Sequence, residues 1–220
     1  ERGDPVFQPS QYWRALNDQN VRQLESHGIA NCKRTVAQNY FTWVVGWLHE
    51  QFRFLVRHTR LRDWPRIVRS IQWTRGDSGL PRRRWLQLQL FTLMMWLYAR
   101  RNDRLGALAD IAEPEIGNPF RVMLDGGIVS QDLANSSLEL NAIAEHFAPA
   151  RTDEFRVLEI GAGYGRDAYL FLSLFPRCRY VIVDIPPALY VSQQYLTAVL
   201  PERRFFGFRP FADVSPFERD

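Results

Sequence analysis

The sequence predicts an α/β protein in which a helical N-terminal region precedes an incomplete parallel sheet. Two observations predict it. Over residues 34–98, apolar side chains recur at helical steps or surround a helix axis. From Arg156 to Asp184, two short apolar runs flank a glycine-rich turn and a helical segment, an order typical of a strand–helix–strand unit. We therefore divide the chain into a helical region, 1–127, and a sheet-containing region, 128–220.

Helices are expected throughout the first region. A short one is predicted over residues 10–27, in a polar stretch that Gly28 ends. Residues 34–58 place apolar side chains at steps of three and four, which predicts an amphipathic helix. After a break at Pro65, a shorter helical piece is predicted over residues 66–74.

Residues 85–98 form an almost continuous apolar run. At about 14 residues, the run is shorter than the roughly 20 that a bilayer-spanning helix needs. Its apolar side chains surround the helix axis, so we predict a buried helix. The alternative is an interfacial membrane helix with the arginines 82–84 at its mouth.

Residues 101–130 are rich in glycine and proline and predict a loop that acts as the hinge between the two regions. A helix is predicted next, from Ser130 to Phe147, with its apolar side chains on one face. The opposite face gathers polar residues at helical steps, and these are Asp132, Asn135, Ser136, Glu139 and His146.

The unit that follows consists of a strand over residues 156–160, a turn with three alternating glycines, a helix from Arg166 and a second strand over residues 179–184. Glycines at alternate positions allow positive φ and bring backbone N–H groups close to a small charged ligand. Asp184 lies 21 residues beyond Gly163, about where a carboxylate meets ribose hydroxyls. The unit therefore predicts an adenosine-containing cofactor.

The spacing of the glycines decides between cofactors. A dinucleotide site needs G-x-G-x-x-G, and Arg166 occupies the place of the third glycine. The acid-x-G-x-G-x-G pattern that begins at Glu159 resembles motif I of the class I S-adenosylmethionine-dependent methyltransferases. The run through Gly165 and Arg166, together with residues 130–136 and 183–187, resembles one branch of them, the sugar O-methyltransferases. The resemblance covers roughly residues 115–213.

This resemblance implies the first half of a Rossmann-like class I methyltransferase fold, in which 128–220 is a partial S-adenosylmethionine-binding domain. It implies transfer of a methyl group to a hydroxyl of a sugar or sugar-containing metabolite. The implied cofactor-binding residues are Glu159, Gly161, Ala162, Gly163, Gly165, Arg166, Asp184, Ile185 and Asp213. Asp184 would meet the ribose, and Arg166 is either a solvated residue or a clamp on the cofactor carboxylate. Asp132, Glu139 and His146 are candidate bases by residue type alone.

Only two strands, or three with Arg204–Phe208, are expected where that fold has seven. The strand at residues 156–160, apolar on both faces, would then lie at an open edge of the sheet. We therefore expect the sequence to be a fragment that ends inside its catalytic domain, that shows little methyl transfer alone and that tends to associate through this edge.

Charge is unevenly distributed, and only Lys33 among the 28 basic residues is a lysine. Residues 1–110 carry 18 basic and 9 acidic residues, whereas residues 111–220 carry 10 and 15. We favour solvated helix faces and interdomain pairing over a nucleic-acid or membrane partner. The two alternatives to a methyltransferase are a nicotinamide-dependent oxidoreductase and a non-enzymatic helical module that binds membranes or nucleic acid.

Two cysteines, Cys32 and Cys178, have no metal-ligand spacing, so the sequence predicts neither a disulfide framework nor a protein-bound metal. A reducing, cytoplasmic location is the expectation that follows.

Overall fold

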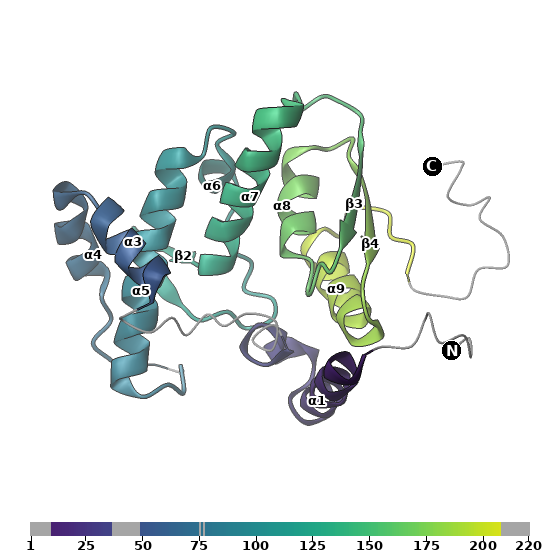
Figure 1. Ribbon diagram of the computed structural model, residues 1–220, viewed down its shortest axis with the longest axis horizontal. Coiled ribbons are helices and arrows are strands. Elements are labelled where there is room, and N and C mark those ends of the chain that lie inside the picture. The colour runs from purple at the N-terminus through teal and green to yellow at the C-terminus, as the bar shows by residue number, and fades with distance from the viewer. Residues whose placement is uncertain (1–9, 37–48, 75, 77, 208–220) are drawn as a thin grey trace, which may run out of the picture.

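A computed structural model describes residues 10–36, 49–74, 76 and 78–207. Helices dominate, and two small sheets complete a mixed α/β architecture (Figure 1). The helices of the N-terminal region and the parallel strands lie at opposite ends of the molecule in this view.

The first predicted helix is confirmed as α1, Gln11–His27. The Ser10 hydroxyl accepts a hydrogen bond from the Trp13 N–H at 3.4 Å, which caps the helix, and Gly28 follows its last turn. A 3₁₀ helix, η2, then covers Ile29–Arg34. Of the amphipathic helix predicted over 34–58, the structure shows α3, Glu50–His58; residues 37–48 lie outside the described residues.

The helical piece predicted over residues 66–74 is displaced. After a 3₁₀ turn, η3 (Leu61–Asp63), the helix α4 runs over Trp64–Ser70. It includes Pro65 in its first turn, where the missing N–H removes no helical hydrogen bond. Pro65 therefore lies inside the first turn of the helix instead of marking a break before it.

The buried helix predicted over 85–98 is confirmed as α5, Arg82–Asn102, which is longer because its first turn includes the three arginines. Gln89 is fully buried, and its side chain bonds the Gln72 backbone N–H (2.7 Å) and C=O (3.1 Å). These bonds offset the cost of burying an amide among apolar groups. Among the described residues, no helix combines the length and the apolar character needed to cross a bilayer.

The predicted hinge loop is partly regular. It contains a short helix, α6 (Ala107–Asp110), and an antiparallel hairpin of β1 (Val122–Leu124) and β2 (Gly127–Val129). The two residues between these strands, Asp125 and Gly126, have φ of 52° and 87°. Positive φ at both positions is what a tight two-residue hairpin needs, and Asp-Gly is a strong sequence signal for it.

The C-terminal elements follow the expected order: α7 (Gln131–Phe147), β3 (Arg156–Ile160), α8 (Arg166–Leu174), β4 (Arg179–Val183) and α9 (Pro186–Val199). Strands β3 and β4 are parallel, in register from Arg156 opposite Arg179 to Ile160 opposite Val183. Helices α7, α8 and α9 lie on one side of this sheet (Figure 1).

The other face of the sheet is exposed, although the apolar run over residues 179–184, which does not alternate, is typical of a parallel strand covered on both faces. The exposed fractions of Leu158 and Ile160 are 63% and 79%, and those of Val181 and Val183 are 54% and 50%. As expected, β3 pairs on one edge only among the described residues. The third strand predicted over 204–208 is wrong for residues 204–207, which are not in a strand; Phe208 lies outside the described residues.

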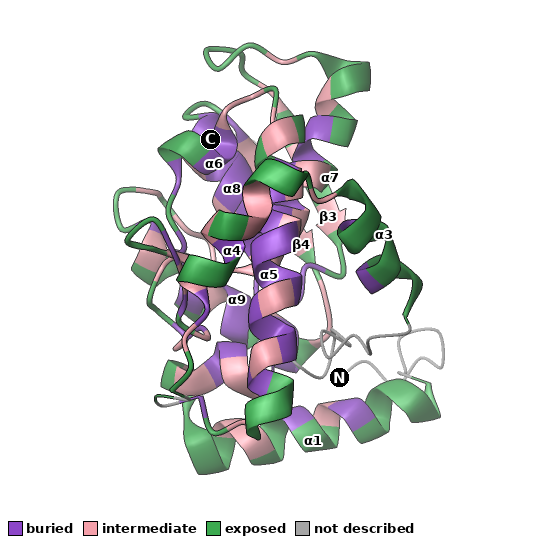
Figure 2. Cartoon of the chain, turned by 90° about the vertical axis from the view of Figure 1, so that its left-hand side faces the viewer, coloured by how far each residue is buried: buried purple, intermediate pink, exposed green. Residues whose placement is uncertain are grey.

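The core is one continuous hydrophobic cluster that joins the two predicted regions. Buried residues recur along α5 (Figure 2), and the same cluster continues through α7 to α8 and α9. The same core extends across residue 127, so it does not mark a domain boundary there. The boundary after residue 127 stays a prediction. The glycine turn is packed against this core through Tyr164, which belongs to the same cluster.

Candidate functional site

The glycine turn has the backbone conformation that the sequence predicted. Gly161, Gly163 and Gly165 have φ of 83°, 59° and 88°. A Cβ at Gly165 would lie 2.9 Å from the Leu196 side chain of α9, whereas a Cβ at Gly161 or Gly163 would meet nothing within 4 Å. Gly165 is therefore needed for packing, and the first two glycines leave open space at the ends of the strands.

Asp184 joins the two strand ends. Its carboxylate accepts hydrogen bonds from the Gly163 N–H at 2.8 Å and from the Ile185 N–H at 2.7 Å. Burial raises its pKa, while these two N–H groups act in the opposite direction. Each carboxylate oxygen has a second lone pair, so Asp184 can still accept hydrogen bonds from a ligand.

Glu159, the first residue of the motif, has a partner inside the protein. Its Oε2 accepts a hydrogen bond from the Tyr180 hydroxyl of β4 at 2.9 Å. Burial raises the pKa of Glu159 from its ordinary 4.5 to about 7, and the nearby Asp167 carboxylate adds to the shift. This carboxyl group therefore ionises near neutral pH.

The raised pKa of Glu159 predicts how stability depends on pH. A carboxyl group whose pKa is higher in the folded state stabilises the fold while it is protonated, and this contribution is lost as pH rises from about 4.5 to about 7. The stability of Glu159→Gln relative to wild type should therefore increase over that range, because glutamine keeps an acceptor for Tyr180 and cannot ionise. Thermal unfolding of both proteins from pH 5 to 8 measures it. A constant difference in Tm across these pH values would contradict the assignment.

Arg166 is not a solvated residue, and its role as a clamp on the cofactor carboxylate stays a prediction. Its Nη2 donates to both Glu139 carboxylate oxygens at 2.8 Å, and its Nη1 donates to the Ser136 hydroxyl at 2.8 Å. Only 13% of its side chain is exposed. Arg166 thus joins α8 to α7, and its N–H group belongs to the helix N-terminus next to the turn.

Asp132 holds the turn from the α7 side. Its Oδ2 accepts a hydrogen bond at 2.9 Å from the hydroxyl of Tyr164, the buried residue between the last two glycines. Burial raises the pKa of Asp132, and the Glu113 carboxylate adds to the shift. Through its hydrogen bond with Tyr164, Asp132 holds the glycine turn in place.

The three candidate bases do not form one cluster. Asp132 contacts Tyr164 in the glycine turn and Glu139 contacts Arg166 at the start of α8, whereas His146 is exposed near the other end of α7. His146 is seven residues beyond Glu139, which places it about 10 Å further along the helix axis. Asp213, expected near the adenine, lies outside the described residues. Within the described ranges, no His, Cys, Asp and Glu side chains gather in a group of three that could hold a metal ion.

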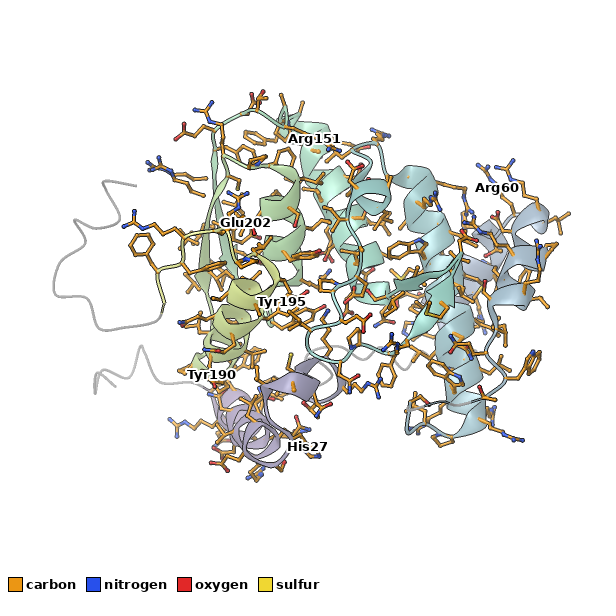
Figure 3. The ribbon with its side chains drawn as sticks, turned by 180° about the vertical axis from the view of Figure 1, so that it is seen from behind. His27, Arg60, Arg151, Tyr190, Tyr195 and Glu202 are labelled. Atoms are coloured by element: carbon orange, nitrogen blue, oxygen red, sulfur yellow. The ribbon has the colours of Figure 1, made fainter. Side chains whose placement is uncertain are left out.

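Sequence reasoning missed the buried ion pair of Lys33 and Glu113, whose side chains are each 3% exposed. Lys33 Nζ also donates to the Pro114 carbonyl at 3.1 Å and lies 5.5 Å and 4.8 Å from the ring centroids of Tyr164 and Tyr195. Figure 3 shows Tyr195 on α9, directed into the molecule. One sequence feature could have pointed to Lys33: it is the single lysine in the chain, and all the other basic residues counted are arginines.

Glu113 extends this contact to α7, because it accepts a hydrogen bond from the hydroxyl of Ser130, the N-cap residue of that helix. Gly117 makes room for the pair: a Cβ there would lie 2.8 Å from Cys32 Sγ and 2.9 Å from Lys33 Cγ. The N-terminal η2 segment is thus packed against the side of the glycine turn through Lys33.

Comparisons of the chain with protein-family models, with curated proteins and with solved structures found no match. The site is therefore defined by its own residues, which are a glycine turn and an acidic residue at the carboxyl ends of two adjacent parallel strands.

Proposed function

We propose that this chain is part of an S-adenosylmethionine-dependent O-methyltransferase. One observation carries the proposal: the Asp184 carboxylate bonds the Gly163 N–H across the carboxyl ends of β3 and β4. In open parallel sheets, ligands bind outside these strand ends, beside a glycine turn that leads into a helix N-terminus. The fold that we propose for this region is accordingly the first half of a Rossmann-like methyltransferase domain.

The residues present fit the proposed cofactor. Open space at Gly161 and Gly163 lets the cofactor approach the backbone, and the α8 N-terminus suits a carboxylate. Asp184 retains lone pairs for two ribose hydroxyl hydrogens, which would give charge-assisted bonds. When bound, S-adenosylmethionine supplies an electrophilic methyl group on a sulfonium.

The acceptor is proposed to be a hydroxyl of a sugar or sugar-containing metabolite, and this rests on the resemblance of residues 130–136 and 183–187 to the sugar O-methyltransferases. A hydroxyl that attacks a methyl group must lose its proton to a base. Asp132 and Glu139 remain the candidates near the turn. Burial is the main cause that raises the pKa of each of these two carboxyl groups above its ordinary value.

A nicotinamide cofactor is disfavoured by the contacts of Arg166. A dinucleotide turn uses its third glycine so that helix and strand can pack closely. Here the Arg166 side chain occupies that position and is bound to Glu139 and Ser136 of α7. No described contact favours this second activity.

Calorimetric titration tests the proposal directly. The purified chain is expected to bind S-adenosylmethionine and S-adenosylhomocysteine, because both carry the ribose and amino-acid groups that the turn and Asp184 would contact. Reduced nicotinamide cofactor should produce no heat beyond dilution. Binding of the nicotinamide cofactor without binding of S-adenosylmethionine would overturn the proposal.

A further inference from the structure

The positive charge of this protein is concentrated in one part of the chain. Residues 50–102, which run from α3 to the end of α5, contain 12 arginines and three acidic residues, although the whole chain has a net charge of only +4. These helices lie at the end of the molecule opposite the β3–β4 sheet (Figure 1). The molecule is therefore electrically asymmetric, with the proposed cofactor turn remote from its basic end.

Among the described residues, most of these arginines have no acidic partner. Two are paired, Arg66 with Asp125 and Arg101 with Asp63. Nine exposed arginines make no ion pair within the part of the chain that the structure describes: Arg53, Arg57, Arg60, Arg62, Arg69, Arg82, Arg83, Arg84 and Arg100. Figure 3 shows Arg60 at the outer limit of this end. Their charges are available to an anionic partner.

Large apolar side chains protrude among these arginines. Leu61 is 89% exposed between Arg60 and Arg62, both exposed as well. Trp73 and Val68 are 76% and 57% exposed. Figure 2 looks onto this side of the molecule, with α3, α4 and α5 toward the viewer. Sequence alone did not show that these side chains stand outside the core.

We propose that this arginine face, the exposed residues of α3, η3 and α4 together with those among residues 73, 74, 76 and 78–84, binds the surface of a lipid bilayer that contains anionic lipids. Guanidinium groups complement lipid phosphates and carboxylates, and they bind more strongly where the membrane surface is negative. Leu61, Val68 and Trp73 enter the boundary between head groups and acyl chains, as the apolar residues of peripheral proteins do.

A nucleic acid is the competing anionic partner, and the apolar side chains disfavour it. Phosphates would satisfy the arginines, and bases could stack on Trp73. Leu61 and Val68, however, would gain nothing from a nucleic-acid backbone, whereas a bilayer removes both from water. The bilayer explains both kinds of side chain on the face.

Co-sedimentation of the full chain with vesicles tests this inference. The protein should bind vesicles of phosphatidylcholine mixed with phosphatidylserine, should not bind phosphatidylcholine alone, and should be released by salt. The double change Arg60→Gln and Arg62→Gln should weaken binding about 25-fold, since each arginine near an anionic surface is worth about a fivefold change. Leu61→Ser should weaken it about tenfold with little change in salt dependence.

The matched control is the double change Arg151→Gln and Arg177→Gln, which removes the same charge from exposed positions outside the arginine face. It should leave vesicle binding unchanged, and circular dichroism should show that all variants are folded. Equal weakening by both double changes, or no binding to anionic vesicles, would overturn the inference. So would binding to single-stranded RNA that exceeds vesicle binding and is insensitive to Leu61→Ser.

Discussion

Asp184→Asn is expected to raise the dissociation constant for S-adenosylmethionine at least tenfold, a loss of about 1.4 kcal/mol. Two effects add. The ribose hydroxyls lose a charged acceptor, and the turn loses part of its support, because both carboxylate oxygens of Asp184 accept backbone N–H bonds. An asparagine side chain has one acceptor, so its NH₂ group must face the N–H of Gly163 or Ile185.

The measurement is a calorimetric titration of both proteins, with Asp18→Asn as the control. Asp18 is exposed on α1, and the same chemical change there should leave the affinity unaltered. If the wild-type protein binds S-adenosylmethionine and Asp184→Asn binds it with the same dissociation constant, the proposed role of Asp184 is rejected. The cofactor assignment would then remain in place.

Lys33→Met is expected to lower the free energy of unfolding by about 3–5 kcal/mol, the usual cost of removing one partner of a buried ion pair. The change leaves the Glu113 carboxylate 3% exposed without its cation. It also removes a cation that lies near the rings of Tyr164 and Tyr195. Chemical denaturation measures the difference.

Two comparisons make this result specific. Adding Glu113→Gln to Lys33→Met should recover part of the stability, since the orphaned charge is then absent. Arg104→Gln, which breaks the exposed pair with Glu145, should cost no more than about 1 kcal/mol. Equal effects of the buried and exposed changes would show that the Lys33 pair is not the structural contact that its burial indicates.

The parts of the fold that could be predicted from sequence are those with local causes. The glycine turn follows from three residues whose positive φ needs no distant contact. The periodic helices α1, α5 and α7 follow from their own apolar spacing. The alignment of Asp184 with the turn follows from the length of one strand–helix–strand unit.

The rest depends on contacts between distant residues. Lys33 and Glu113 are 80 residues apart, and neither lies in a sequence pattern that predicts its contact with the other. For Arg166 the sequence allowed a solvated side chain, and the contacts with α7 that exclude it come from residues 27 and 30 positions earlier. Likewise, an apolar run such as that of β3 shows that a strand can be buried. It does not show that other elements cover both faces of the strand.

The burial of Lys33 also gives the protein a chemical signature. The chain has a single ε-amino group, and that group is enclosed by Glu113 and two tyrosine rings. Acylating reagents react with an amine only where they can reach it, and the Lys33 side chain is only 3% exposed in the folded chain. A mass increase at Lys33 would therefore record the opening of the junction between η2 and the glycine turn. One covalent label thus measures how often the N-terminal segment separates from the rest of the protein.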